Sequence, residues 1–422
     1  MNRRRRATAV ICFLSIGMAG CAISPERASP APEGFFSAWA APQGRLAEQA
    51  PNLNDSTVRV VVRPTIDGTA LRIKLENTIA KTPVTFAAVY VGKLDRDATL
   101  ANGTNKPLTF GGQSKVTLAP GAGIYSDVID FPVKAFQRLA VSMDVISATE
   151  VSTHALGLAS NYYAAGHRAQ SESGDGFTLL PTRAQNAVSF PVYWVAALDV
   201  KSNATAGTIV ALGDSITDGR CSTTDADGNV VPDLYQRWTD ILAERLASMP
   251  KSYAKAVVNS GIAGNRVLEE AVTGPPALAR FDRDVLDRAG ITHIILFEGT
   301  NDIHRGSTAA ELIEGTRQLI DRAHARGVKI IGATMIPRGQ PEVTAREGFD
   351  ETKERYRLEF NEWVRKQAKF DSIIDFEAEM LGGGTSAQGA QIMKREYSCD
   401  FVHPNGAGHR ALGESIDLQL FQ

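Results

Sequence analysis

The sequence predicts a doubly wound α/β domain of about five parallel strands at residues 206–422, preceded by an antiparallel β-sandwich of jelly-roll type at residues 56–205. Three observations support this division. A chain of 422 residues exceeds one ordinary hydrophobic core. Its first half carries short runs rich in Val, Ile, Thr and aromatic residues, separated by turn residues. After residue 207, strand-like and helix-like segments alternate, as in a parallel sheet covered on both faces.

The first domain is predicted from six β-rich runs. Turn pairs such as Asp67-Gly68 and Asn102-Gly103 lie between them, which is typical of antiparallel sheets. The runs cover residues 57–62, 70–76, 84–91, 115–118, 139–146 and 187–200.

The second domain is predicted from apolar strands that alternate with segments of helical periodicity. One helix ends at Gly327, a residue that favours a helix C-terminus. The expected strands are 208–212, one ending at 257–258, 291–297, 328–335 and 373–376, and the expected helices are 235–249, 280–288, 309–326, 351–369 and one after 405–406.

Composition indicates a soluble globular protein. Apolar residues make up 43% and charged residues 22%, and 45 basic against 47 acidic side chains leave a formal net charge of −2. No basic stripe with interleaved aromatic residues is present, so a nucleic-acid partner is not expected. No run after the first residues reaches the length of a membrane-spanning helix.

The N-terminus is predicted to be an export segment over residues 1–21. Four arginines at 3–6 precede a short apolar stretch, which is typical of a signal peptide. Met18-Ala19-Gly20-Cys21 resembles the lipobox of bacterial lipoproteins, which makes Cys21 a candidate for lipidation. We therefore expect a periplasmic or outer-membrane lipoprotein, or alternatively a plainly cleaved and secreted protein. Residues 22–55, rich in Ala, Pro, Ser, Gly and Gln, are expected to form a tether, with local order around Phe35, Phe36 and Trp39.

The candidate nucleophile is Ser215. The apolar strand 208–212 ends in Gly213-Asp214-Ser215, which would deliver one hydroxyl to the rim of the sheet. A serine hydroxyl is a weak nucleophile unless a base accepts its proton. A histidine, an orienting carboxylate and oxyanion donors are therefore required elsewhere in the chain.

Suitable partners follow other strands or stand in the closing loop. Gly264 follows the second strand and can offer an open backbone N–H, and Asn301 follows the third and can donate its side-chain amide. Asp400 and His403 have the spacing at which a carboxylate reaches one imidazole nitrogen while the other faces the serine. Each residue alone also has an ordinary structural explanation, such as a turn, a helix cap or a surface acid.

In this order, the motifs resemble those of the SGNH hydrolases, also called GDSL esterases and lipases, over roughly residues 207–420. The matching blocks are Gly213-Asp214-Ser215, the glycine at 264, Gly299-Thr300-Asn301-Asp302, and Asp400 with His403, while Ile216 replaces the usual leucine. The resemblance is closest to a bacterial branch with an added N-terminal β domain. It implies a flavodoxin-like three-layer domain and a Ser-His-Asp triad that needs neither a metal nor another cofactor.

Other residues are candidates for substrate binding or for bracing the site. Asp218, Asn265 and Arg266 adjoin the motifs, and His304 follows Asp302 closely enough to reach the crevice. If the triad forms, Cys221 and Cys399 lie on loops that meet at one crevice, so we expect a disulfide between them, with two free buried thiols as the alternative.

The predicted function is hydrolysis of short-chain carboxylic esters by an exported serine esterase, with small-molecule or glycan esters, including acetylated carbohydrates, as substrates. A lipase or lysophospholipase is the second interpretation. A glycan-binding surface lipoprotein without catalysis is the third, and acyl transfer to an alcohol remains compatible with the same acyl-enzyme.

Overall fold

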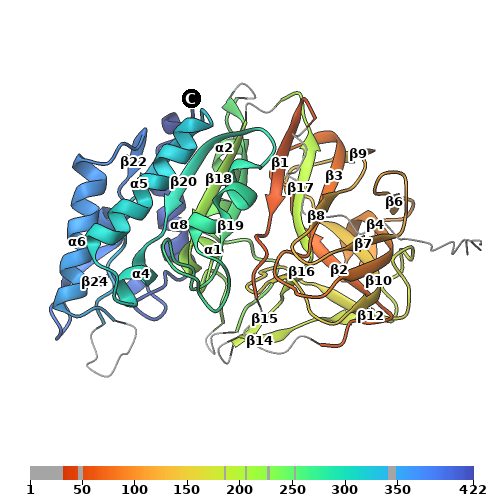
Figure 1. The fold of residues 1–422 in the computed structure, drawn as a ribbon, viewed down its shortest axis with the longest axis horizontal. Coiled ribbons are helices and arrows are strands. Elements are labelled where there is room, and N and C mark those ends of the chain that lie inside the picture. Colours follow the sequence, from red (N-terminus) through yellow and green to blue (C-terminus); the bar gives the residue numbers. More distant parts are fainter. Residues whose placement is uncertain are drawn as a thin grey trace, which may run out of the picture.

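The structure is a computed structural model that describes residues 32–45, 51–184, 187–204, 207–225, 229–250, 253–340 and 348–422. The predicted export segment, Cys21 and the first part of the predicted tether lie outside these residues. Two parts lie side by side in Figure 1: a strand-rich N-terminal domain and a C-terminal domain in which helices surround a sheet. Within the described ranges, no helix is both long and apolar enough to cross a lipid bilayer.

The N-terminal domain is built from two antiparallel sheets. One has the strand order β1-β17-β3-β8 with β9 also paired to β3, and the other has the order β13-β12-β2-β10-β4-β5 with β6 and β7 paired to β4. The strands of the first sheet are β1 Phe35–Ala40, β3 Gly68–Glu76, β8 Gly123–Tyr125, β9 Ile129–Val133 and β17 Val195–Lys201. Those of the second are β2 Ser56–Val62, β4 Val84–Arg96, β5 Thr99–Leu100, β6 Lys106–Leu108, β7 Val116–Leu118, β10 Leu139–Ala148, β12 Tyr162–Ala165 and β13 Thr178–Leu179.

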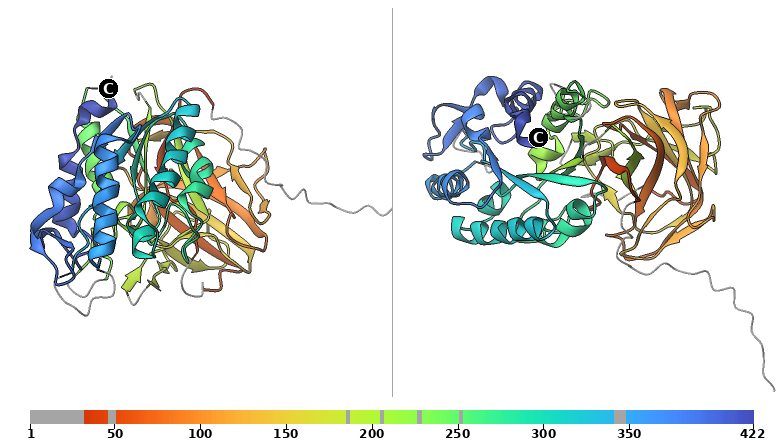
Figure 2. Two further views of the ribbon diagram at one scale, coloured as in Figure 1. Left: turned by 60° about the vertical axis from the view of Figure 1, so that its left-hand side comes forward. Right: turned by 90° about the horizontal axis from the view of Figure 1, so that it is seen from above.

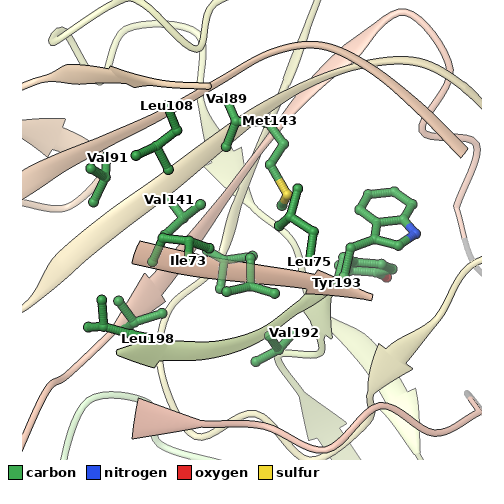
Figure 3. Packing of buried hydrophobic residues seen from close by; sticks show 14 of the residues in the cluster. Ile73, Leu75, Val89, Val91, Leu108, Val141, Met143, Val192, Tyr193 and Leu198 are labelled. Atoms are coloured by element: carbon green, nitrogen blue, oxygen red, sulfur yellow. The ribbon is translucent and has the colours of Figure 1, made fainter. Parts of the chain in front are cut away.

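One apolar core joins the two sheets. Ile73 and Leu198 of the first sheet belong to the same buried cluster as Val89 and Val141 of the second (Figure 3). Every residue of β2 is buried, and four of its seven residues are valines, which pack well in a strand. The predicted antiparallel two-sheet domain is therefore observed, whereas its jelly-roll order stays a prediction.

Two short strand pairs complete this domain. The pairs are β11 Thr153–His154 with β16 Val192–Tyr193, and β14 Thr182–Ala184 with β15 Ala187–Ser189. The predicted single strand 187–200 is therefore wrong, because the chain is divided into β15, β16 and β17. Proline at 191 cannot donate to a strand ladder, and Trp194 has a φ of 55°, outside the extended region.

The predicted tether is wrong over residues 35–40. This segment forms β1, which pairs antiparallel with β17 and packs against β19 of the second domain. The backbone N–H of Ser37 donates to the carbonyl of Ala289 at 2.9 Å. Figure 1 shows β1 between the two parts of the molecule, so the segment connects them instead of leading away from them.

The C-terminal domain has the predicted five-stranded parallel sheet, in the order β19-β18-β20-β21-β22. This order is that of flavodoxin-like folds, in which ligands bind at the carboxyl ends of the strands. The strands are β18 Thr208–Gly213, β19 Ala256–Gly261, β20 Ile291–Phe297, β21 Lys329–Ala333 and β22 Ser372–Ile374. The last is shorter than predicted, because Asp375 caps a helix with its side chain.

Helices cover both faces of this sheet, as the view from above in Figure 2 shows. Val210 and Leu212 pack in one cluster with Phe281 and Leu319, while Ile209 packs on the opposite face with α2 and α8. The helices are α1 Ser215–Asp218, α2 Trp238–Ala247, α3 Ala277–Phe281, α4 Thr300–His304, α5 Ala309–Ala325, α6 Glu351–Lys366, α7 Phe376–Met380 and α8 Gly406–Ser415. Shorter elements are the π-helical turn η2 Asp282–Leu286, the 3-10 turns η3 Arg395–Tyr397 and η4 Leu418–Phe421, and the hairpin of β23 Leu381–Thr385 with β24 Gln391–Met393.

Candidate active site

Ser215 is placed by the turn between β18 and α1. It is the first residue of α1, and the side chain of Asp214 caps that helix by accepting the N–H of Ile216 at 2.9 Å. Gly213 is required at the end of β18, because a Cβ there would lie 2.2 Å from Thr217 Oγ1. The first N–H groups of a helix have no partner within that helix, so the Ser215 N–H is available beside its own hydroxyl.

Three of the predicted residues form one hydrogen-bonded series. Ser215 Oγ lies 2.8 Å from His403 Nε2, and His403 Nδ1 lies 2.8 Å from Asp400 Oδ2. The other oxygen of Asp400 accepts the backbone N–H groups of Val402 and His403, at 2.9 and 2.7 Å. These bonds fix the carboxylate, so the imidazole can present its second nitrogen to the serine hydroxyl.

The environment favours the neutral form of His403 and the ionised form of Asp400. Burial lowers the pKa of His403, Asp400 raises it, and the guanidinium groups of Arg220 and Arg338 lower it, so the pKa stays below its usual value of 6.5. Burial would raise the pKa of Asp400, but its bonds to His403 and the backbone bring it far below the usual 3.8. A neutral imidazole can accept the proton of the serine hydroxyl.

Gly264 and Asn301 follow β19 and β20, the two strands that flank β18, and their role as oxyanion donors stays a prediction. Gly264 has a φ of 75°, which favours glycine, and its N–H has no acceptor within the described residues. The amide of Asn301 donates to the carbonyl of Asn265 at 3.0 Å, which leaves its second hydrogen for another acceptor. Both groups can therefore donate to a developing oxyanion.

Sequence reasoning missed Arg338, which orients this amide. Its Nη1 lies 3.3 Å from Asn301 Oδ1 and 3.1 Å from Thr300 Oγ1. Because Oδ1 faces a cation, the amide nitrogen of Asn301 is directed the other way. Arg338 follows β21 at the carboxyl edge of the sheet, and this position is the signal that could have identified it.

Of the two roles expected for Asp218 and Asn265, the structure supports bracing of the site and not substrate binding, because both side chains are buried and engaged. Asp218 is 1% exposed and accepts hydrogen bonds from His154 and from the Ala263 N–H, each at 2.8 Å. Asn265 is completely buried, and its side chain bonds Arg280 and the carbonyl of Pro275. Neither side chain has a surface to offer a substrate, since both hold the loop that carries Gly264.

The other two predicted binding residues lie nearer the surface. The guanidinium of Arg266 pairs with Glu269 at 2.7 Å and also reaches the carbonyl of Glu270. His304 ends α4, three residues after Asn301, and is half-buried. Arg266 is thus held by its own loop, and binding of substrate by His304 stays a prediction.

The predicted disulfide between Cys221 and Cys399 is confirmed, and it links segments 178 positions apart. Cys221 follows α1, and Cys399 immediately precedes Asp400, so the bridge joins the nucleophile turn to the loop of the acid and base. Atoms of Cys221, Asp400 and His403 lie within 4.8 Å of one another, as metal ligands can. The sulfur of a disulfide is not the thiolate that binds metals, so this group does not fit a metal site.

A cluster of buried carboxyl groups lies beneath the nucleophile. Burial raises the pKa of Asp214 to about 7, that of Glu298 to about 8 and that of Asp302 to about 6. Asp302 accepts the N–H groups of Val267 and Leu268 and so positions the loop after Gly264. A small cavity of about 10 Å³ adjoins Asp214 and Glu298.

The geometry is that of a candidate serine nucleophile with a base and an acid in line, and comparison with known proteins gives the class of the enzyme. Residues 211–411 match the GDSL-like Lipase/Acylhydrolase family. This part of the chain therefore belongs to that family, as its motifs predicted, and the protein is an ester hydrolase. No curated protein matches the chain.

Solved structures with a similar fold cover about half of the chain. A carbohydrate acetylesterase from Sinorhizobium meliloti is 16% identical, with 50% of this chain and 95% of that chain covered and a TM-score of 0.38. An aryl esterase from M. smegmatis is 18% identical, with 50% and 96% covered and a TM-score of 0.39. A GDSL-like lipase from Bacteroides thetaiotaomicron is 18% identical, with 51% and 88% covered and a TM-score of 0.37.

Proposed function

We propose that the protein is an exported serine esterase that hydrolyses carboxylic esters of short acyl chains, with acetylated carbohydrates among its substrates. The observation that carries the proposal is the continuous hydrogen-bonded series from Ser215 through His403 to Asp400. Such a series activates a hydroxyl without a metal. Export follows from the charged and apolar character of residues 1–21, and lipidation at Cys21 would retain the protein at a membrane.

The reaction follows from the positions of these groups. His403 Nε2 accepts the proton of Ser215 as the oxygen attacks the ester carbonyl, and Asp400 stabilises the imidazolium that forms. The Ser215 and Gly264 N–H groups and the Asn301 amide hold the tetrahedral oxyanion. The intermediate collapses when His403 protonates the leaving alkoxide, which leaves an acyl group on Ser215. Water then gives a proton to His403 and attacks the acyl carbon. The second intermediate releases the carboxylic acid as His403 returns that proton to the Ser215 oxygen.

The limited access to the nucleophile supports short acyl groups. Ser215 is 6% exposed, and the side chain of His403 is 14% exposed. A compact acyl group reaches such a nucleophile with less rearrangement than a long chain does. A profile from acetate to palmitate esters tests this point, and fastest turnover at long chains would favour the lipase interpretation.

The decisive experiment compares the intact protein with two active-site variants and one matched control variant. Ser215→Ala and His403→Ala should abolish release of acetate from a short aryl ester and from acetylated glycans. His324→Ala is the control, since His324 also pairs with an aspartate, Asp371, at 3.0 Å, but on the exposed surface of α5. Full activity of the Ser215→Ala variant would overturn the proposed function. Glycan binding without any hydrolysis by the intact protein would favour the non-catalytic interpretation.

A further inference from the structure

A histidine of the β domain reaches the catalytic domain at its interface. His154 lies in β11, is 5% exposed, and places Nε2 at 2.8 Å from Asp218 Oδ1. Its Nδ1 lies 3.1 Å from the carbonyl oxygen of Pro42, in the segment that follows β1. The ring is therefore held between an oxygen of its own domain and a carboxyl group of the helix that carries Ser215.

Both atoms that face this ring are acceptors in their usual states. A neutral imidazole has one N–H and can donate to only one of them. Each ring nitrogen nevertheless lies within hydrogen-bond distance of an acceptor, 3.1 Å for the Pro42 carbonyl and 2.8 Å for the Asp218 carboxyl group. A hydrogen bond that a carboxylate accepts is charge-assisted, and such bonds hold their partners more firmly than neutral ones.

Asp218 transmits this contact to the loop of the oxyanion donors. Its second oxygen accepts the Ala263 N–H at 2.8 Å, and Ala263 directly precedes Gly264. The loop and α1 are in close contact, because a Cβ at Gly261 would lie 2.3 Å from the Asp218 nitrogen. One carboxylate in α1 thus connects the helix of the nucleophile to the peptide that precedes the second oxyanion donor.

The β domain holds the same loop from its other side. Thr273 Oγ1 donates to the Ala263 carbonyl at 2.6 Å, and the Arg45 N–H donates to the Thr273 carbonyl at 2.7 Å. Arg45 belongs to the same segment as Pro42, the second partner of His154. Ala263, the residue that precedes Gly264, is therefore fixed at both its N–H and its carbonyl by contacts that lead to the β domain.

We propose that His154 is a positioning residue of the esterase: through Asp218 it holds the N–H of Ala263 and thereby places the adjoining Gly264 N–H where it meets the oxyanion. The inference rests on the proposed function and assigns the β domain a part in catalysis. Oxyanion donors act mainly on the transition state and depend on exact preorganisation. Loss of His154 should therefore lower kcat and leave KM nearly unchanged.

The test measures kcat and KM for a short aryl ester with His154→Ala and His154→Gln. We expect kcat to fall about 10- to 100-fold in both, with KM within about threefold of the unaltered protein. Thr65→Val is the matched interface control, because Thr65 Oγ1 bonds both the N–H and the carbonyl of Val257 across the same domain boundary, each at 3.1 Å. It should lower thermal stability while kcat stays unchanged.

A double-variant comparison separates positioning from general damage. If His154 acts through Asp218, its loss should matter less once that carboxyl group has been removed. We expect His154→Ala to change kcat less than about threefold in an Asp218→Ala background. Independent, multiplicative losses would overturn the proposal, as would an unchanged kcat in the folded His154→Gln variant or equal kcat losses in Thr65→Val. Retained activity of Ser215→Ala would instead refute the proposed function itself.

Discussion

Ser215 Oγ and His403 Nε2 lie 2.8 Å apart although 188 positions separate the two residues in the chain. The turn after β18 delivers the serine, and the loop before α8 delivers the histidine. The disulfide between Cys221 and Cys399 ties these two segments together next to the pair. The contact needs the whole parallel sheet to form, because the first strand and the last loop of the domain meet only in the folded state.

The pH dependence of kcat/KM should show an acid limb with its midpoint below 6.5. The proton acceptor must be neutral, and burial together with Arg220 and Arg338 lowers the pKa of His403. Activity is therefore present above that pKa and is lost as the pH falls through it. The rate of alcohol release from a short ester, measured by chromatography at several pH values around 6.5, gives the midpoint. A midpoint above 6.5 would contradict the assignment.

Replacing Arg220 with glutamine should move that limb to higher pH. The substitution removes a positive charge that disfavours imidazolium, so the pKa of His403 should rise. The comparison variant is Arg410→Gln, whose guanidinium belongs to an exposed pair with Glu414. An unchanged limb in Arg220→Gln, or an equal shift in both variants, would show that this charge does not act on His403.

Asn301→Ala should lower kcat about 100- to 1,000-fold, since one oxyanion donor is typically worth that much. KM should change little, because the donor acts on charge that develops only in the transition state. Asn102→Ala, in an exposed turn of the N-terminal domain, serves as the control. A rise in KM with an unchanged kcat would make Asn301 a substrate-binding residue instead.

Removing the disulfide with Cys221→Ala and Cys399→Ala together should lower the unfolding free energy by about 2 to 5 kcal/mol. It should also lower kcat, since the bridge holds the segments of Ser215 and Asp400 together. Denaturant titration and ester turnover measure the two effects. Two titratable thiols from this pair in unfolded, unreduced protein would show that the bridge is absent in solution.

Glu298→Gln should reduce the loss of unfolding free energy that occurs as the pH rises. Burial raises the pKa of this carboxyl from 4.5 to about 8, so its contribution is fully present below 4.5 and is lost as the pH rises to 8. In this range, the slope of the unfolding free energy against pH should become less steep by up to about 1.4 kcal/mol per pH unit. Denaturation midpoints at several pH values measure it, with the exposed Glu362→Gln as control. Parallel curves for the unaltered protein and Glu298→Gln would contradict the prediction.

Much of the site could be predicted because most of its functional residues directly follow the ends of strands. Ser215, Gly264 and Asn301 each follow a strand of the sheet, and parallel strands bring their carboxyl ends to one edge. The close sequence spacing of Asp400 and His403 predicted their contact. Arg338 follows the same rule after β21, but arginine occurs too often on surfaces for its position alone to stand out.

The remaining features depend on packing that sequence spacing does not encode. Asp218 and Asn265 adjoin the motifs in sequence, yet their side chains are buried. Their burial depends on how the loop folds onto α1, which sequence spacing does not show. His154 lies in the other domain, and only the interface brings it to Asp218. Residues 35–40 have a tether-like composition around them, but pairing with β17 overrides local composition.

Mass spectrometry of the enzyme quenched during turnover of a short aryl ester tests the central claim most directly. We predict that the acyl group is found on the peptide that contains Ser215, and that the Ser215→Ala variant carries none. Acylation of a different residue in the intact protein, or continued turnover by Ser215→Ala, would contradict the assignment of Ser215 as the nucleophile.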